Sequence, residues 1–177
     1  GKCGSDRAES VVTDIHARER VVRGRMAVTA DGGVAALAFD DLTGIGPYSM
    51  YPRTSAIEAN QVLNLTGAPY VVANYRATAR VVFQNKNMMC QYRAVGHPIA
   101  MAICDGLLEE AAAAIGMDPV AIRRRNLMRD DGYPCQSASG MKLDDLSHHK
   151  TLDTLLGLMD YDRLRAEQAA LREKGIH

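Results

Sequence analysis

The residues best suited to chemistry lie in one stretch, Asn85 to Pro98, which contains a cysteine, a tyrosine, an arginine and a histidine. The planar guanidinium of Arg93 suits polar or anionic groups. Gly96 permits a tight turn with positive φ. Pro98 fits the first position of a helix, and the free amides of that helix N-terminus favour an anion near Arg93 to Gly96. The stretch therefore predicts a strand-to-helix crossing that faces a ligand.

The elements on either side of this stretch position it. Tyr70 to Phe83 is rich in β-branched and aromatic residues and predicts an extended segment, and Met88 to Arg93 predicts a second one. Pro98 to Ile115 has the clearest helical pattern. Its apolar stripe is wide enough to predict burial over much of the helix circumference. The residues of the stripe are Met101, Cys104, Leu108, Ala111 and Ile115, widened by Ile103, Leu107 and Ala114.

The first third of the chain predicts a β-hairpin. Arg20 to Ala30 alternates apolar and charged residues, Asp31-Gly-Gly33 is a turn signal, and Val34 to Phe39 is the returning strand. Asp6 to His16 is compatible with a strand or a short helix, whereas Thr54 to Leu65 predicts a helix. The fold class is therefore mixed α/β, a hairpin-based sheet with helices.

The last third predicts helices and a turn-rich connection. Asp118 and Pro119 begin a short helix that ends near Asn126. Asp130 to Gly140 is rich in turn residues. A helix follows from Thr151 to Met159, and Asp160 or Asp162 caps a last helix that ends near Lys174.

Composition excludes some classes of function. The 177 residues include 21 basic and 21 acidic ones, so the net charge gives no reason to expect nucleic acid or a membrane as a partner. No apolar run approaches the roughly 20 residues of a spanning helix, and no secretory leader is recognised. Cys3, Cys90, Cys104 and Cys135 lack CxxC spacing, which favours free thiols and a cytoplasmic location.

Several segments, taken together in order, resemble the molybdenum hydroxylase family, which includes xanthine dehydrogenases, aldehyde oxidases and the large subunits of aerobic carbon monoxide dehydrogenases. Tyr92-Arg-Ala-Val-Gly-His-Pro98 is similar to the family's Phe/Tyr-Arg-Gly-x-Gly-x-Pro loop. Asp118-Pro-Val-Ala-Ile-Arg-Arg-Arg-Asn126 is similar to Asp-Pro-x-x-Leu/Ile-Arg-x-x-Asn. Ser5 to Glu9, His16-Ala-Arg18 and Gly46-Pro-Tyr48 match further segments.

This resemblance implies that Tyr92, Arg93, Ala94, Val95 and Gly96 lie against a molybdenum–molybdopterin cofactor in its cytosine dinucleotide form, and that Val95 and His97 line the substrate pocket. The implied activity is hydroxylation of an aldehyde or N-heterocycle with water as the oxygen source. Val95 stands where purine oxidisers often have Phe, and no arginine occurs near Glu58 to Gln61, so purines are disfavoured. Ala94 replaces the cysteine that holds copper in the carbon monoxide enzymes.

The resemblance also implies that the chain is an internal fragment of the molybdopterin-binding region. Residues 1–130 would belong to the first half of that region, and 131–177 to the connection and the start of the second half. The family's catalytic glutamate, in a Gly-Glu motif, is not found after Arg93, and Glu109 and Glu110 are poor substitutes. We therefore expect the isolated chain to be inactive. Expected partners are the remainder of the large subunit, iron–sulfur and FAD subunits or domains, and a small-molecule substrate.

Three other interpretations remain open. Arg123-Arg-Arg125 is compatible with nucleic-acid binding, although zero net charge and the lack of interleaved aromatic residues favour an ion-paired helix end. The Ala/Leu-rich helix is compatible with a structural fragment that serves as an assembly surface without cofactor or activity. Cys90 and His97 are compatible with a thiol enzyme only if a turn brings them together.

Overall fold

The computed structural model describes residues 1–52 and 54–176 and has the mixed α/β fold that the sequence predicts. Three strands form the main sheet: β1 (Arg20–Val28), β2 (Val34–Gly44) and β3 (Tyr75–Val82). β2 lies in the middle, antiparallel to β1 and parallel to β3. The parallel pair needs a crossover between its strands, and that crossover contains the helix α2 (Ile57–Leu65).

The predicted hairpin is confirmed. Residues of β1 alternate between partly buried and exposed, which places Val22 and Met26 on the inner face and Arg23 and Arg25 on the outer one. The turn passes through Gly32 at φ +82°, where a Cβ atom would lie 2.6 Å from the sulfur of Met117. The positive φ strains any residue with a Cβ atom, and a side chain here would also displace that of Met117, so glycine is favoured at this turn.

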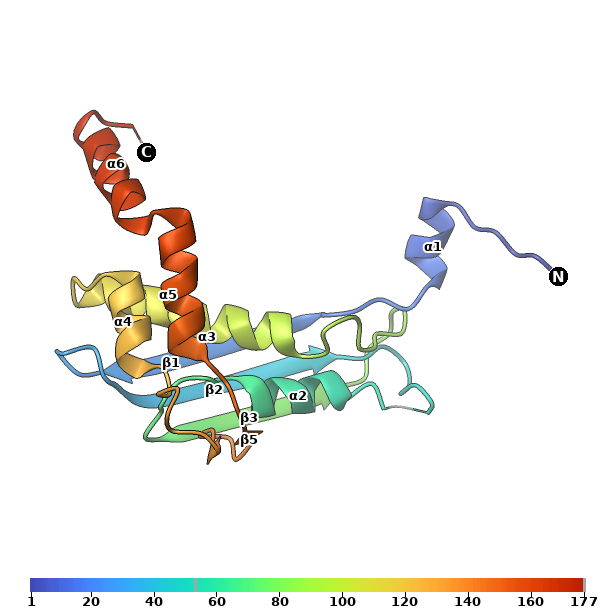
Figure 1. Cartoon of the computed structure of the whole chain (residues 1–177). Helices are drawn as coiled ribbons and strands as arrows, with labels where there is room; N and C mark the ends of the chain where they lie inside the picture. The colour runs from blue at the N-terminus through green and yellow to red at the C-terminus, as the bar shows by residue number, and fades with distance from the viewer. Residues whose placement is uncertain (53, 177) are drawn as a thin grey trace.

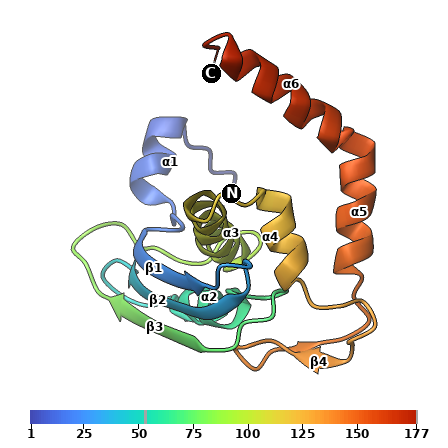
Figure 2. The ribbon, with the colours of Figure 1, turned by 90° about the vertical axis from the view of Figure 1, so that its left-hand side faces the viewer.

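Two helices cover the inner face of the sheet, as Figures 1 and 2 show. α3 (His97–Ala114) packs on β1 and α2 packs on β3. The core forms where α3, the hairpin and α4 (Pro119–Asn126) meet. Its buried residues are Val34, Tyr70, Cys104, Leu108, Ala112 and Ile122.

Three details of α3 correct the sequence expectations. Gly96 is the N-cap, so the helix begins at His97 and Pro98 occupies the second position. The buried stripe is narrower than expected, since Met101 is 49% exposed and the only fully buried residues of α3 are Ala100, Cys104, Leu108 and Ala112. The sheet covers one side of the helix only, which leaves the other side open.

The extended segments before α3 are also shorter than expected. Regular pairing begins at Tyr75 rather than Tyr70, and Met88 to Arg93 forms no strand. A single bridge joins Met89 to His16. Because the segment around His16 pairs with Met89 over one bridge only, the backbone after Met89 leaves that segment and forms a loop.

The N-terminal segment resolves as a helix, one of the two alternatives for Asp6 to His16. α1 covers Arg7–Thr13 and begins with a capping box in which the Asp6 carboxylate accepts from the Glu9 amide and the Glu9 carboxylate accepts from the Asp6 amide. Satisfying these two amides favours helix over strand.

The C-terminal segment forms a small hairpin and then a projecting arm. β4 (Cys135–Gln136) pairs with β5 (Lys142–Leu143) inside the predicted turn-rich connection. α5 (His148–Met159) and α6 (Tyr161–Glu173) then extend away from the sheet in both views. α5 begins three residues before the predicted Thr151 because the Asp130 carboxylate accepts from the amides of His149 and Lys150 at 3.0 Å.

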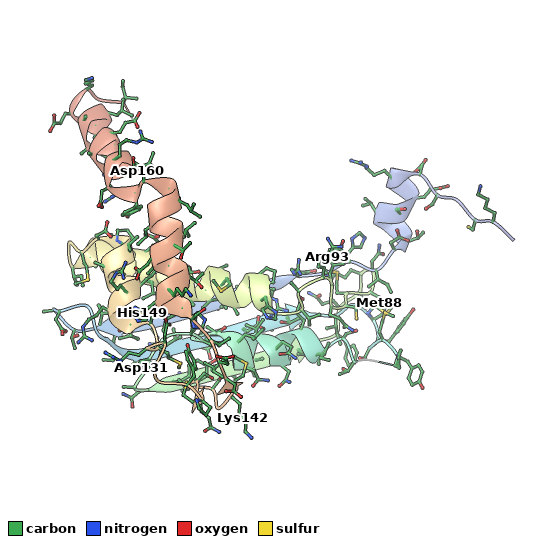
Figure 3. The ribbon with its side chains drawn as sticks, in the orientation of Figure 1. Met88, Arg93, Asp131, Lys142, His149 and Asp160 are labelled. Atoms are coloured by element: carbon green, nitrogen blue, oxygen red, sulfur yellow. The ribbon has the colours of Figure 1, made fainter. Side chains whose placement is uncertain are left out.

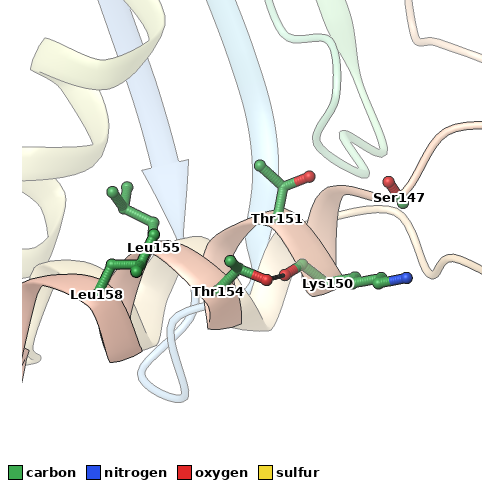
Figure 4. A pocket seen from close by; sticks show the side chains of 6 residues that line it. All are labelled: Ser147, Lys150, Thr151, Thr154, Leu155 and Leu158. Atoms are coloured by element: carbon green, nitrogen blue, oxygen red, sulfur yellow. Dashed lines mark hydrogen bonds between the residues drawn. The ribbon is translucent and has the colours of Figure 1, made fainter.

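The arm exposes much of its apolar surface. None of the residues of α5 and α6 is buried, and Leu158 is 82% exposed. A shallow hollow follows one face of α5 from Ser147 to Leu158, where Thr154 donates to the Lys150 carbonyl (Figure 4). Within the described ranges, no helix combines the length and the apolar character needed to cross a membrane.

Candidate functional site

Four segments that are distant in sequence meet at one end of the sheet, where Figure 3 labels Met88 and Arg93. The Cys90 amide donates to the His16 carbonyl at 2.8 Å, and the Met89 amide donates to the Ile45 carbonyl at 3.0 Å. Glu58, at the start of α2, contacts the same region from the inner face. The segments His16–Arg18 and Gly46–Tyr48 of the family resemblance thereby approach the loop from Tyr92 to Gly96, whereas Asp118–Asn126 forms α4 and contacts the hairpin turn.

The Glu58 carboxylate is the centre of this arrangement. It is 3% exposed and accepts hydrogen bonds from three donors, each at 3.3 Å: the Arg18 Nε, the Arg20 guanidinium and the backbone amide of Gly96. A buried carboxylate is stable only when it is paired and hydrogen-bonded. Glu58 therefore ties the β1 end of the sheet to the N-cap residue of α3.

A second buried carboxylate extends the network. Arg20 is 5% exposed in its side chain and donates to Asp41 on β2 at 2.9 Å. The Thr43 hydroxyl donates to the same Asp41 oxygen at 3.0 Å. Burial raises the pKa of Asp41, although Arg20 and Thr43 both favour the charged form. We take Asp41 as ionised, because the buried Arg20 guanidinium pairs with one of its oxygens at 2.9 Å and the Thr43 hydroxyl donates to the same oxygen.

Arg18 links the network to the loop. It adopts the left-handed φ of +67°, and its guanidinium donates to the Arg93 carbonyl. The same guanidinium lies over the Tyr92 ring, 5.7 Å from the centroid. One side chain therefore contacts a buried carboxylate, a loop carbonyl and a loop ring.

The loop itself has an unusual backbone. Ala94 has φ +60° and Gly96 has φ +80°, and the His97 amide donates to the Ala94 carbonyl at 2.9 Å. A Cβ atom on Gly96 would lie 2.6 Å from the Gln61 Cβ, so α2 and α3 approach each other closely here. The expected positive φ at Gly96 is confirmed.

The predicted anion at the N-terminus of α3 is supplied by the chain itself. The Glu58 carboxylate accepts a hydrogen bond from the Gly96 amide, and the His97 amide donates to the Ala94 carbonyl within the turn. The sequence analysis missed this internal anion. A ligand at the loop must therefore bind to other donors.

Such donors are present on the exposed side of the loop. Tyr92, Arg93 and Ala94 are exposed, Val95 is half-buried and Gly96 is buried. Within the part of the chain that the structure describes, the Arg93 guanidinium has no hydrogen-bond or ion-pair partner, and the amides from Tyr92 to Val95 reach no protein acceptor. A free guanidinium beside free amides fits a polar or anionic group, as the cofactor assignment of this loop requires.

His97 is exposed, and its Nδ1 lies 3.2 Å from the Val95 carbonyl. A groove of about 420 Å³ begins at Pro98 and follows α3 along β1. Its walls are mostly apolar, with Val22, Ile99, Ile103 and Leu107 among them. Val95 and His97 therefore lie near the mouth of an apolar groove, although neither residue lines it.

The other candidate chemistries are not assembled. Cys90 is buried and its sulfur contacts the Gln91 side chain, whereas the His97 ring bonds within its own loop. The three consecutive arginines of α4 are each ion-paired. Arg123 pairs with Asp105 and Glu109. Arg124 pairs with Asp153, and Arg125 pairs with Asp31. Among residues 1–52 and 54–176, no cluster of three His, Cys, Asp or Glu side chains is placed to hold a metal ion.

Comparisons with known proteins show the family of the chain and the relatives of its fold. The model of the molybdopterin cofactor-binding domain matches residues 2–127. The large subunit of nicotine 6-hydroxylase from Paenarthrobacter nicotinovorans is 27% identical over 96% of this chain and 21% of its own length. The crystal structure of quinoline 2-oxidoreductase from Pseudomonas putida 86 superposes with a TM-score of 0.86 at 26% identity, over 97% of this chain and 22% of that one.

The carbon monoxide dehydrogenase large chain of Hydrogenophaga pseudoflava is 25% identical over 94% of this chain. The chain thus belongs to the molybdopterin cofactor-binding domain family of the molybdenum hydroxylases. It spans about a fifth of the length of these curated relatives.

Proposed function

We propose that the chain forms one wall of the molybdenum cofactor site in the large subunit of a hydroxylase. The observation that carries this proposal is the loop from Tyr92 to Gly96, which is fixed from behind by Glu58 and Arg18, while the amides of Tyr92 to Val95 and the Arg93 guanidinium have no partner among the described residues. A loop held in this way presents donors to a bound group without first having to order itself.

Residue roles follow from exposure and donor chemistry. Arg93 and the backbone amides of Tyr92 to Val95 would hold polar groups of the molybdopterin, and Gly96 lets the backbone approach α2. Val95 and His97, beside the apolar groove, would contact substrate. When bound, the cofactor supplies oxidation of a substrate carbon with water as the oxygen source.

The proposed substrate is an aldehyde or an N-heterocycle. Relatives named for nicotine and quinoline support the heterocycle, and an aldehyde oxidoreductase from Megalodesulfovibrio gigas, 30% identical over 59% of this chain, supports the aldehyde. Ala94 supplies no thiolate for copper, which argues against carbon monoxide. The chain contains no Gly-Glu motif after Arg93, so we propose that it does not turn over substrate by itself.

The wider assembly is also a proposal. Relatives bear the names of a large subunit and of a dehydrogenase complex subunit. This supports partner subunits or domains that carry iron–sulfur clusters and FAD, with the pterin in its cytosine dinucleotide form. We extend the proposal to a cytoplasmic location, which the four free cysteines support. Residues 1–130 would belong to the first half of the molybdopterin-binding region, and residues 131–177 to the connection and the start of the second half.

A second role, as an assembly surface, is favoured by the arm. Leu155, Leu158 and Met159 on α5 are at least 45% exposed, and such a row of apolar side chains favours contact with another protein surface. This role is compatible with the first one. It would stand alone if the chain proved unable to hold a cofactor.

The test is the intact mass of the purified protein together with its molybdenum and pterin content. Stoichiometric molybdenum would support the cofactor role, and Arg93→Gln should then lower that content. Arg23→Gln, on the outer face of β1, is the control and should leave it unchanged. A metal-free species of 19.2 kDa would favour the assembly role, and equal molybdenum in both variants would contradict the assignment of Arg93.

A further inference from the structure

We infer that Glu58 is a positioning residue: its buried carboxylate, shared by Arg18, Arg20 and the Gly96 amide, sets the conformation of the loop from Tyr92 to Gly96. No side chain of the loop is itself buried, and only the backbone of Gly96 lies in the interior. Since Val95 is the one side chain of the loop that is even half-buried, apolar packing of the loop's own residues restrains it little. Its conformation must come from the groups that contact its backbone.

Those groups converge on Glu58. The carboxylate binds the Gly96 amide directly and binds Arg18, which in turn donates to the Arg93 carbonyl and covers the Tyr92 ring. The two ends of the loop are thus held by one carboxylate, one directly and one through Arg18. Ala94, between them, retains its left-handed φ because both ends are fixed.

The charge of Glu58 is essential to this arrangement. Arg18 and Arg20 bring two positive charges to the network, and Glu58 and Asp41 bring two negative ones. A neutral side chain of the same shape would still accept from the Gly96 amide, but it would leave Arg18 without a charged partner. Arg18 would then have no electrostatic reason to stay between the sheet and the loop.

This inference rests on the proposed function only where it concerns the ligand. A loop whose ends are fixed keeps the Arg93 side chain and the amides of Tyr92 to Val95 directed outward. Loss of the carboxylate should therefore lower affinity for an anionic group at the loop without removing any residue that contacts it.

The experiment uses Glu58→Gln in the 177-residue chain, with Glu109→Gln as the matched control. Glu109 undergoes the same chemical change and also pairs with an arginine, Arg123 at 3.1 Å, but it lies on the exposed side of α3. Amide hydrogen exchange at Gly96 and His97 should be about ten- to a hundredfold faster in Glu58→Gln, because the hydrogen bond to the Gly96 amide loses its charged acceptor and Arg18 no longer holds the other end of the loop. Glu109→Gln should leave both amides unchanged. Unchanged exchange in a folded Glu58→Gln chain would overturn the inference.

If Glu58→Gln does not fold, Arg18→Gln tests the inference instead. Arg18 is partly exposed, and its removal leaves Glu58 paired with Arg20, so this variant should fold. The backbone order parameters of Tyr92 to Val95 should fall from rigid values of about 0.85 to below about 0.6. Order parameters that stay at the wild-type values would overturn the inference.

A titration with inorganic pyrophosphate separates this inference from the proposed function. In the wild-type chain, the amide shifts of Tyr92 to Val95 should report binding, and Glu58→Gln should weaken it about tenfold. If pyrophosphate causes no shifts in the wild type, the proposed role of the loop fails. The exchange rates at Gly96 and His97 still decide whether Glu58 positions the loop.

Discussion

At the loop end of the sheet, the side chains of Arg20, Asp41 and Glu58 are at most 5% exposed, whereas at the arm end Arg124 and Asp153 are 42% and 56% exposed. Both regions are rich in ion pairs. Only the buried pairs are shielded from water and salt, so they determine backbone positions at the loop. The exposed pairs orient the arm but contribute little to stability.

This difference matches what each region must do. A ligand-facing loop needs a fixed backbone, and a buried network provides it. An arm with exposed leucines needs only to be presented to another surface. The comparison leads to four predictions about where charge and hydrogen bonding matter.

The largest effect is expected at Arg20. Arg20→Met removes the partner of Asp41 and one partner of Glu58, which leaves charge uncompensated in the interior. Removing one member of a buried pair costs about 3–5 kcal/mol, so the free energy of unfolding should fall by that amount or the chain should not fold. Urea denaturation followed by circular dichroism measures it.

Arg23→Met is the matched control, since Arg23 lies three residues along the same strand on the exposed face. Its effect should stay within about 0.5 kcal/mol. Equal losses in the two variants would remove the distinction between buried and exposed charges.

Asn126 is expected to show the next largest effect, because it is a buried polar residue at the arm end. Its side chain accepts from the Val34 amide and donates to the carbonyls of Gly32 and Ile122, each at 2.8 Å. Asn126→Ala should cost about 1–3 kcal/mol, since it leaves buried hairpin groups unpaired. Chemical denaturation checks this, with exposed Asn60→Ala as the control; an equal cost at Asn60 would contradict it.

Local signals allowed the hairpin and α4 to be predicted. Asp31-Gly-Gly33 defines the turn, and Asp118-Pro119 defines the start of α4, because in each case the interacting groups are sequence neighbours. The family loop was predicted for a different reason, namely its resemblance to known segments. Its place as a cofactor loop stays a prediction.

The network behind the loop could not be predicted in this way. Glu58 and Arg20 are 38 residues apart, and Arg20 and Asp41 are 21 apart. Charged residues in a sequence are usually solvated, and only the folded sheet shows that these are not. The start of α5 was misplaced for the same reason, since Asp130 caps it from 19 residues upstream.

A smaller effect is expected from pH at the base of the arm. Tyr133 lies 2.6 Å from the His148 Nδ1, and partial burial lowers the pKa of His148 below its usual value of 6.5. The unfolded chain therefore binds the proton more readily, so stability should fall as pH drops below about 6.5. The protection factors of the α5 amides, compared between about pH 7.5 and about pH 5.5, measure it. A His148→Gln chain with the same pH dependence would contradict the assignment.

The smallest effect is expected within the arm itself. Arg163 pairs with Asp160 and Glu167, and all three side chains are more than half exposed. Pairs of this kind on a helix surface contribute about 0.3–0.5 kcal/mol at low salt and less in salt. Arg163→Ala should therefore change the helicity of α6 only slightly, measured by circular dichroism at low and high salt. A loss as large as that of Arg20→Met would mean that the arm is fixed by its charges, and the contrast between the two ends of the molecule would no longer hold.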